Sequence, residues 1–203
     1  MRIVGDKVYI KLIFFGTALA GKTTALQYLF KNVIPKDMRK SDRIRSIDTS
    51  FGQTLLFDFI HIDVGENIFF HIYTATGQDY YASTRRMLME EVDGVLFMVD
   101  SQKKELQHNK EFVDEFNKYL KTVEGLREAE VIVLYNKQDL EEIYSPDYLE
   151  KELDFHRYAS FPTCALTGMN IEAAFILMVG FLLRKLKENQ EFKAYEQRNK
   201  RTD

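Results

Sequence analysis

Short apolar segments recur along the chain and are separated by polar, turn-forming residues. Residues 7–15, rich in β-branched and aromatic side chains, predict a largely buried strand. Similar patterns predict further strands over residues 55–63, 68–73, 94–99, 131–135 and 161–166. Apolar positions at helical spacing predict helices over residues 24–30, 109–123 and 171–186.

This alternation of strands and helices is typical of a mostly parallel sheet with helices on both faces. The Gly65-Glu66-Asn67 turn joins two neighbouring strands and so adds one antiparallel strand at the edge. We therefore predict an α/β fold of three layers around a mostly parallel, six-stranded sheet. The fold is expected to occupy residues 1–190, followed by a charged tail over residues 191–203.

The composition fits one domain and excludes several classes of protein. The chain has 203 residues, and its formal net charge of -3 argues against nonspecific nucleic-acid binding. Cys164 is the only cysteine, so a disulfide framework is excluded and a reducing, cytoplasmic setting is expected. The sequence shows neither a signal peptide nor the roughly 18 apolar residues of a membrane-spanning helix. We expect a cytoplasmic monomer with no integral membrane segment.

A phosphate-binding loop follows the first predicted strand. The segment Gly16-Thr17-Ala18-Leu19-Ala20-Gly21-Lys22-Thr23 matches the pattern G-x-x-x-x-G-K-[ST] and is followed by a predicted helix. Two glycines let the backbone curl with its N–H groups pointing inward, the Lys22 ammonium reaches the β- and γ-phosphates, and the Thr23 hydroxyl can bind Mg²⁺. The predicted phosphate-binding positions are Gly16, Ala18, Leu19, Ala20, Gly21, Lys22, Thr23 and Thr24. The alternative is a chance match in an ordinary turn.

A guanine-reading motif, Asn136-Lys137-Gln138-Asp139, follows the predicted strand over residues 131–135. The Asp139 carboxylate can accept from both N1–H and the exocyclic amine of guanine, whereas adenine would leave it unpaired. The aliphatic part of Lys137 can cover the base, and Asn136 can tie this loop to the phosphate loop. Backbone N–H groups around Ala165 and Leu166 can meet the guanine O6. The alternative is a solvated Asn-Lys-x-Asp turn.

Between these motifs lie candidates for catalysis. Gly77 can offer its backbone N–H to the γ-phosphate, and Gln78 can orient the attacking water. Thr54 can bind Mg²⁺ and the γ-phosphate before hydrolysis and release them afterwards. The predicted catalytic residues are therefore Gln78, Lys22 and Thr54, and the predicted metal ligands are Thr23 and Thr54. The alternatives are a helix-start glutamine for Gln78 and a strand-start threonine for Thr54.

The chain resembles the Ras-like small GTPases, and within them the prokaryotic MglA-type branch. The segments that carry the resemblance are 54–59, 71–78, 92–95, 100–102 and 135–139. The resemblance implies a P-loop G domain that acts as a GTP/GDP switch with Mg²⁺. It also implies a prokaryotic source, a role in polarity or localisation, and a partner of the roadblock fold that accelerates slow hydrolysis.

Three residues depart from these patterns: Thr74 and Ala18 from that of the wider Ras-like family, and Gln53 from that of the MglA-type branch, which resembles this chain in having Thr where Thr74 stands. Thr74 replaces a carboxylate that would hold an Mg²⁺-bound water, Ala18 replaces a glycine beside the γ-phosphate, and Gln53 stands where MglA-type proteins tend to carry an arginine. A GTP-binding scaffold with little or no hydrolysis is therefore the competing function. A P-loop ATPase or kinase is a third, disfavoured by residues 136–139. Arg85 and Arg86 are interpreted as a solvated helix face.

Overall fold

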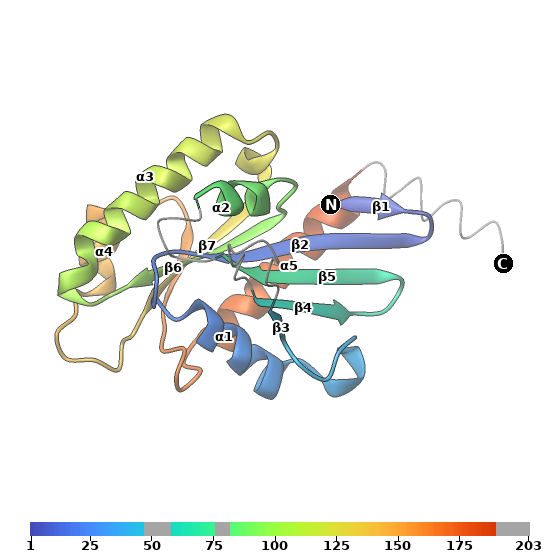
Figure 1. Cartoon of the computed structure of the whole chain (residues 1–203), viewed down its shortest axis with the longest axis horizontal. Helices are drawn as coiled ribbons and strands as arrows, with labels where there is room; N and C mark the ends of the chain where they lie inside the picture. The colour runs from blue at the N-terminus through green and yellow to red at the C-terminus, as the bar shows by residue number, and fades with distance from the viewer. Residues whose placement is uncertain (47–57, 76–81, 190–203) are drawn as a thin grey trace, which may run out of the picture.

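The computed structural model describes residues 1–46, 58–75 and 82–189, and within these ranges eight strands form one sheet (Figure 1). The strands are β1 (Arg2–Val4), β2 (Lys7–Phe15), β3 (Arg45–Ser46), β4 (Asp58–Asp63), β5 (Ile68–Thr74), β6 (Gly94–Asp100), β7 (Glu130–Asn136) and β8 (Ala159–Pro162). The α-helices are α1 (Lys22–Tyr28), α2 (Ala82–Met89), α3 (Leu106–Thr122), α4 (Pro146–Glu152) and α5 (Ile171–Glu188). Shorter helical turns are η1 (Leu29–Val33), η2 (Lys36–Met38), η4 (Lys103–Glu105) and η5 (Leu126–Glu128).

The sheet has the order β3-β4-β5-β2-β6-β7-β8, with β1 paired to β2. Strands β5, β2, β6, β7 and β8 run parallel, and β4 is antiparallel to β5. The predicted fold class is thereby confirmed. Two short strands, β1 and β3, were not predicted. The Gly5-Asp6 turn folds β1 back onto β2, with Gly5 at φ 61°, a backbone conformation that glycine adopts without strain.

Alternate side chains of the strands enter two separate cores, as expected when both faces of a sheet are covered. Leu12 and Phe14 of β2 point toward α1 and α5, whereas Ile13 and Phe15 point toward α2, α3 and α4. All four side chains are fully buried. Figure 1 shows the resulting three layers, with α2 and α3 on one side of the sheet and α1 on the other.

Most of the predicted elements are present, with different ends. The structure places β2 at the predicted bounds and starts α5 at the predicted residue. The strand predicted over 161–166 is wrong beyond Pro162, because the chain turns there: Gly168 N–H donates to the Cys164 carbonyl over 2.8 Å. Helix α4 was not predicted, although Ser145 caps it by accepting from the Tyr148 N–H and Pro146 begins it.

The parallel strands bring their carboxyl ends to one edge of the sheet. Phe14 pairs with Thr74 across β2 and β5, and Asp100 pairs with Asn136 across β6 and β7. Ligands of open α/β sheets bind at such an edge. None of the helices in residues 1–46, 58–75 and 82–189 is both long and apolar enough to span a bilayer. The expected tail over 191–203 lies outside the described residues.

Candidate nucleotide-binding site

The phosphate loop runs from β2 into α1 and is shaped by two glycines. Gly16 has φ 141°, and a Cβ there would lie 2.1 Å from the Met98 carbonyl oxygen. Gly21 has φ 107°, and a Cβ there would lie 2.3 Å from the Asn136 side-chain nitrogen. A side chain at either position would strain the backbone and collide with a neighbour, so the loop requires glycine twice.

Lys22 is held inside this loop. Its ammonium donates to the carbonyl oxygen of Gly16 over 2.8 Å and to that of Thr17. The residue is only 7% exposed, and burial lowers the pKa of its amine to about 7, with a smaller contribution from the charge of Arg85. An anion in the loop would favour the charged ammonium.

Beside Lys22, three oxygen-bearing side chains from distant segments meet. The Thr23 hydroxyl donates to an Asp58 carboxylate oxygen over 2.7 Å, and the Thr74 hydroxyl donates to the same oxygen over 3.3 Å. The Asp58 backbone N–H donates in return to the Thr74 hydroxyl over 3.0 Å. A carboxylate with hydroxyl neighbours is a donor set that suits Mg²⁺.

Sequence reasoning did not identify Asp58 as part of the site. It recognised Asp58 only as a polar interruption of an apolar segment. The antiparallel register of β4 and β5, which pairs Phe59 with Tyr73, brings the start of β4 beside Thr74. The sequence offered one signal for Asp58, which is that its carboxylate interrupts an otherwise apolar strand. Its place beside the phosphate loop depends on the pairing of β4 with β5.

Asn136 connects the phosphate loop to the predicted base-reading loop, as its motif predicts. Its side-chain N–H donates to the Ala20 carbonyl over 2.7 Å. Its side-chain oxygen accepts from the Ala165 backbone N–H over 2.8 Å and from the Thr163 hydroxyl over 3.2 Å. Asn136 is 2% exposed, so these bonds form away from water.

The other predicted base-reading side chains lie at the rim of this edge. Asp139 is exposed. Lys137 has φ 70°, and its ammonium pairs with the buried Asp100 carboxylate over 2.6 Å. Leu166 is 76% exposed and Leu19 is 89% exposed, which leaves two apolar side chains beside the loops. Ala18 and Thr24 lie in the same loop and first helical turn.

Three predicted residues lie outside the described residues: Thr54, Gly77 and Gln78. The structure therefore does not test their predicted roles. Within the described ranges, there is no group of three or more histidine, cysteine, aspartate or glutamate side chains that could hold a metal ion. A metal at this edge would have one carboxylate, that of Asp58, beside hydroxyls and oxygens of a ligand.

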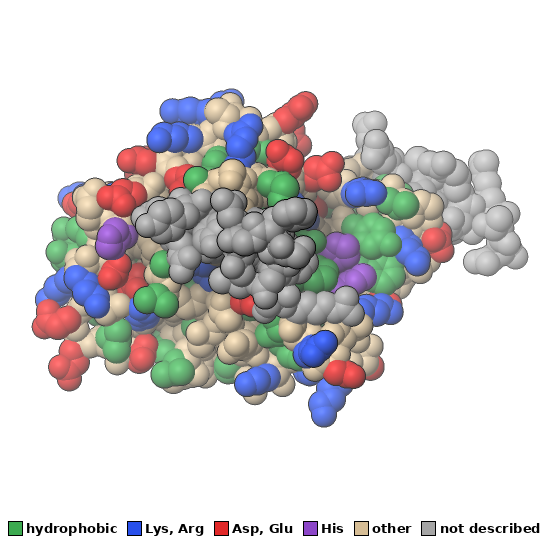
Figure 2. Space-filling view, in the orientation of Figure 1, with side chains coloured by type: hydrophobic (Ala, Val, Ile, Leu, Met, Phe, Trp, Pro, Cys, Tyr) green, Lys and Arg blue, Asp and Glu red, His purple; other side chains and the backbone are tan. Residues whose placement is uncertain are grey.

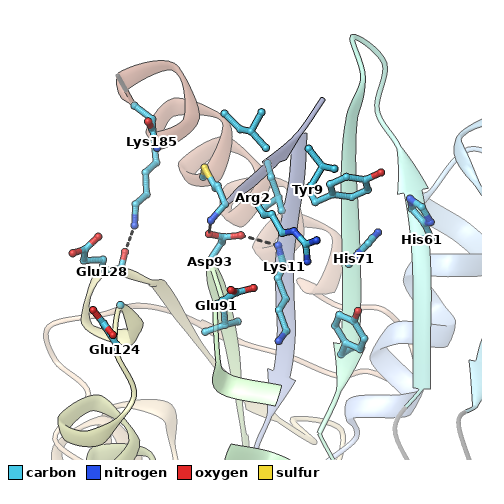
Figure 3. A pocket seen from close by; sticks show the side chains of 18 of the residues that line it. Arg2, Tyr9, Lys11, His61, His71, Glu91, Asp93, Glu124, Glu128 and Lys185 are labelled. Carbon is cyan, nitrogen blue, oxygen red and sulfur yellow. Dashed lines mark hydrogen bonds and ion pairs between the residues drawn. The ribbon is translucent and has the colours of Figure 1, made fainter. Parts of the chain in front are cut away.

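A large cavity lies elsewhere. It has a volume of about 1120 Å³ and is lined by Tyr9, Lys11, His61, His71 and Asp93, among others (Figure 3). Tyr9, Lys11, His61 and His71 belong to the half-buried face of β2, β4 and β5, and Asp93 directly precedes β6. None of the five is a predicted site residue. Figure 2 shows acidic and basic side chains interspersed over the visible face, with no large region of one sign.

Comparisons with known proteins agree with this geometry. A family model described as the ADP-ribosylation factor family matches residues 2–180. The mutual gliding-motility protein MglA of Myxococcus xanthus is 29% identical over 188 residues, which cover 90% of this chain and 94% of MglA. The Ras-related protein RabH of Dictyostelium discoideum is 23% identical over 94% of this chain and 88% of RabH.

One solved structure extends the comparison to three dimensions. The small GTPase Arl6 BBS3 from Trypanosoma brucei, with the nucleotide analogue GppNp bound, matches with a TM-score of 0.65 and 16% identity. The match covers 87% of this chain and 99% of Arl6. At this identity the likeness shows the fold alone.

Proposed function

Since the chain belongs to the ADP-ribosylation factor family of small GTPases, we propose that it is a Mg²⁺-dependent GTP/GDP switch that hydrolyses GTP slowly and whose turnover a partner accelerates. The observation that carries the proposal is the side chain of Asn136. It bonds at once to the loop that matches the phosphate-binding motif and to the loop expected to meet guanine. A nucleotide spanning both loops would use this edge.

Residues at the exposed rim of the carboxyl-end edge of the sheet would select guanine. Asp139, exposed beside the Asn136 anchor, would pair with guanine N1–H and the exocyclic amine. The Lys137 stem, fixed by the Asp100 ion pair, would lie along the base. Ala165 and Leu166 would border the base from the neighbouring loop. Adenine would leave the Asp139 carboxylate unpaired, which disfavours ATP.

The residues present fit Mg²⁺. Thr23 and Thr54 would bind the ion through their hydroxyls, and Asp58 supplies the carboxylate charge that Thr74 lacks. When bound, the ion would neutralise charge on the β- and γ-phosphates. Asp58 would hold the Thr23 hydroxyl in place, and Thr74 would hold Asp58.

Turnover would depend on Gln78 and on the crowding near Ala18. Gln78 would orient the attacking water, while Lys22 would face the γ-phosphate charge. The Ala18 methyl group would crowd the water, so we expect a slow intrinsic rate. A partner of the roadblock fold would raise it by ordering the Thr54 and Gln78 segments. Similarity to MglA, a protein named for gliding motility, supports a role in polarity or localisation.

The proposal extends to the domain, the oligomeric state and the location of the protein. Residues 1–190 would form the GTPase domain, monomeric and cytoplasmic, with the charged tail over 191–203 outside it. The competing function is a GTP-binding scaffold, and Ala18 and Thr74 are the observations that favour it. A scaffold would keep the base-reading and phosphate loops but would not turn over.

Single-turnover hydrolysis separates the two functions. The parent protein and the Gln78→Leu variant are each loaded with GTP and followed alone and with a roadblock-type partner. A switch predicts that Gln78→Leu keeps GTP binding and loses both intrinsic and stimulated hydrolysis. Equal rates for parent and variant under both conditions would favour the scaffold. Competition of GTP binding by ATP tests base choice in the same preparation.

A further inference from the structure

A charged residue lies in the core between α2 and α3. Arg85 is 2% exposed, contrary to its interpretation as part of a solvated helix face. Its guanidinium makes two parallel bonds to the Glu115 carboxylate of α3, over 2.7 Å from Nε and 2.8 Å from Nη2. Such a bidentate pair fixes orientation as well as distance.

Two aromatic residues of α3 complete the cluster. The Arg85 guanidinium lies over the Phe112 ring, 4.9 Å from its centroid. The Tyr119 hydroxyl contacts the Glu115 carboxylate and lies 3.0 Å from the Ala82 carbonyl oxygen, donating its single hydrogen to one of them at a time. Burial, together with the bond to Glu115, raises the pKa of Tyr119, so the hydroxyl keeps its proton.

The cluster holds the first turn of α2. Ala82 is the first residue of α2 and follows Gln78 by four positions, and Arg85 lies one turn further. The contacts of Ala82 and Arg85 with α3 therefore fix the position of the first described residues after the Gln78 segment.

Stability alone does not explain a buried ion pair. Removing two charges from water costs free energy that their attraction only partly returns, and apolar replacements are often as stable. A buried ion pair that fixes the orientation of its two side chains is instead useful where the position of a helix near a reacting centre must be exact. A displacement of about 1 Å near a reacting centre can cost roughly 100-fold in rate.

We propose that Arg85, Glu115 and Tyr119 form an anchor on α3 that positions the start of α2 for GTP hydrolysis. They are positioning residues, since none is placed to touch the nucleotide. The inference rests on the proposed role of Gln78. The adjacent Arg86 is exposed and bonds to Thr122 of the same helix α3, so it is the matched control.

The experiment compares the full-length parent with Glu115→Gln, Tyr119→Phe and Arg86→Gln. Single-turnover GTP hydrolysis, the Kd for GTP and the melting temperature are measured for each. Glu115→Gln should slow hydrolysis by roughly tenfold or more while the Kd for GTP stays within about twofold of the parent. Tyr119→Phe should slow hydrolysis less, and Arg86→Gln should match the parent.

A double variant separates positioning from a general loss of stability. In the Gln78→Leu background, Glu115→Gln should cause little further loss of rate, because both changes act on one step. A parent-like rate for Glu115→Gln, beside a slow Gln78→Leu, would overturn the anchor alone. A parent-like rate for Gln78→Leu would instead overturn the proposed function. If Glu115→Gln does not fold, Tyr119→Phe decides: a parent-like rate overturns the anchor.

Discussion

The Thr23 hydroxyl donates to the Asp58 carboxylate over 2.7 Å, although 35 residues separate the two in the chain. The contact links the phosphate loop to the first described residue of β4. The Thr74 hydroxyl donates to the same carboxylate. A single carboxylate at the start of β4 thus accepts from hydroxyls of both α1 and β5, beside the phosphate loop.

Neutralising that carboxylate should weaken the metal site. We expect Asp58→Asn to raise the Mg²⁺ concentration needed for nucleotide binding by about 10–100-fold, the usual effect of losing a group that orients a metal ligand. GTP affinity at saturating Mg²⁺ should change much less. A Mg²⁺ titration of GTP binding measures this. Asp63→Asn, at the other end of β4 and paired with Lys40, is the control and should leave the titration unchanged.

Removing the Lys22 ammonium should abolish most nucleotide binding. We expect Lys22→Ala to weaken the affinity for GTP by roughly 10–100-fold or more, since bonds to charged groups each contribute about 1.5–3 kcal/mol. Equilibrium binding of a fluorescent GTP analogue measures the loss. Affinity equal to the parent would show that this loop does not hold phosphates.

The same amine should make nucleotide binding depend on pH. Its pKa is about 7 in the folded chain and 10.5 ordinarily, and phosphates favour the protonated form. Affinity should fall as pH rises above 7, with proton uptake on binding that calorimetry in different buffers detects. Without nucleotide, the unfolded chain binds the extra proton between pH 7 and 10.5, so this group makes folding more favourable as pH rises. A pH-independent affinity would contradict the shift.

Replacing the Asp139 carboxylate with an amide should change which nucleotide base the protein prefers. Asp139→Asn should weaken GTP and improve xanthosine triphosphate, because the C2 carbonyl of xanthine suits an amide donor. Competition between the two nucleotides gives the ratio of affinities. Glu141→Gln, an exposed acid two residues further along the same loop, should leave the ratio unchanged. Unaltered GTP affinity in Asp139→Asn would remove its base-reading role.

Two glycines allow backbone strain to be separated from a steric clash. Gly21 and Gly125 both have positive φ, but only at Gly21 would a Cβ meet a neighbour, the Asn136 amide. Gly125→Ala should cost about 1–2 kcal/mol of unfolding free energy from strain alone. Gly21→Ala should cost more and should also weaken GTP binding. Denaturant unfolding and GTP titration of both variants measure the difference.

The sequence predicted the local geometry of those loops whose motif lies in one short segment. The loop around Lys22 and the residues following β7 are of this kind, and Asn136 bonds to Ala20 as its motif predicts. The Ras-like resemblance is also confirmed. The geometry of a short motif is predictable because the flanking strand and the turn chemistry are both encoded locally.

The remaining residues depend on pairing between distant segments. Asp58 reaches the site only through the register of β4 on β5, and Arg85 is buried only because Glu115 of α3 faces it. From its neighbours in the sequence, Asp58 is only a polar interruption of an apolar segment, and Arg85 is interpreted as part of a solvated helix face. The predicted end of the last strand was wrong because the apolar residues that follow Pro162 lie in a turn and not in β8.

Asn136 makes the two halves of the nucleotide site into one hydrogen-bonded unit. In a guanine nucleotide, a ribose joins the base to the phosphates covalently; in the protein, one buried amide joins the corresponding loops. Guanosine and pyrophosphate offered separately should therefore bind with positive coupling, since ordering either loop orders the other. Nucleotide release would then require both loops to loosen together, so dissociation should be slow even where each half binds weakly.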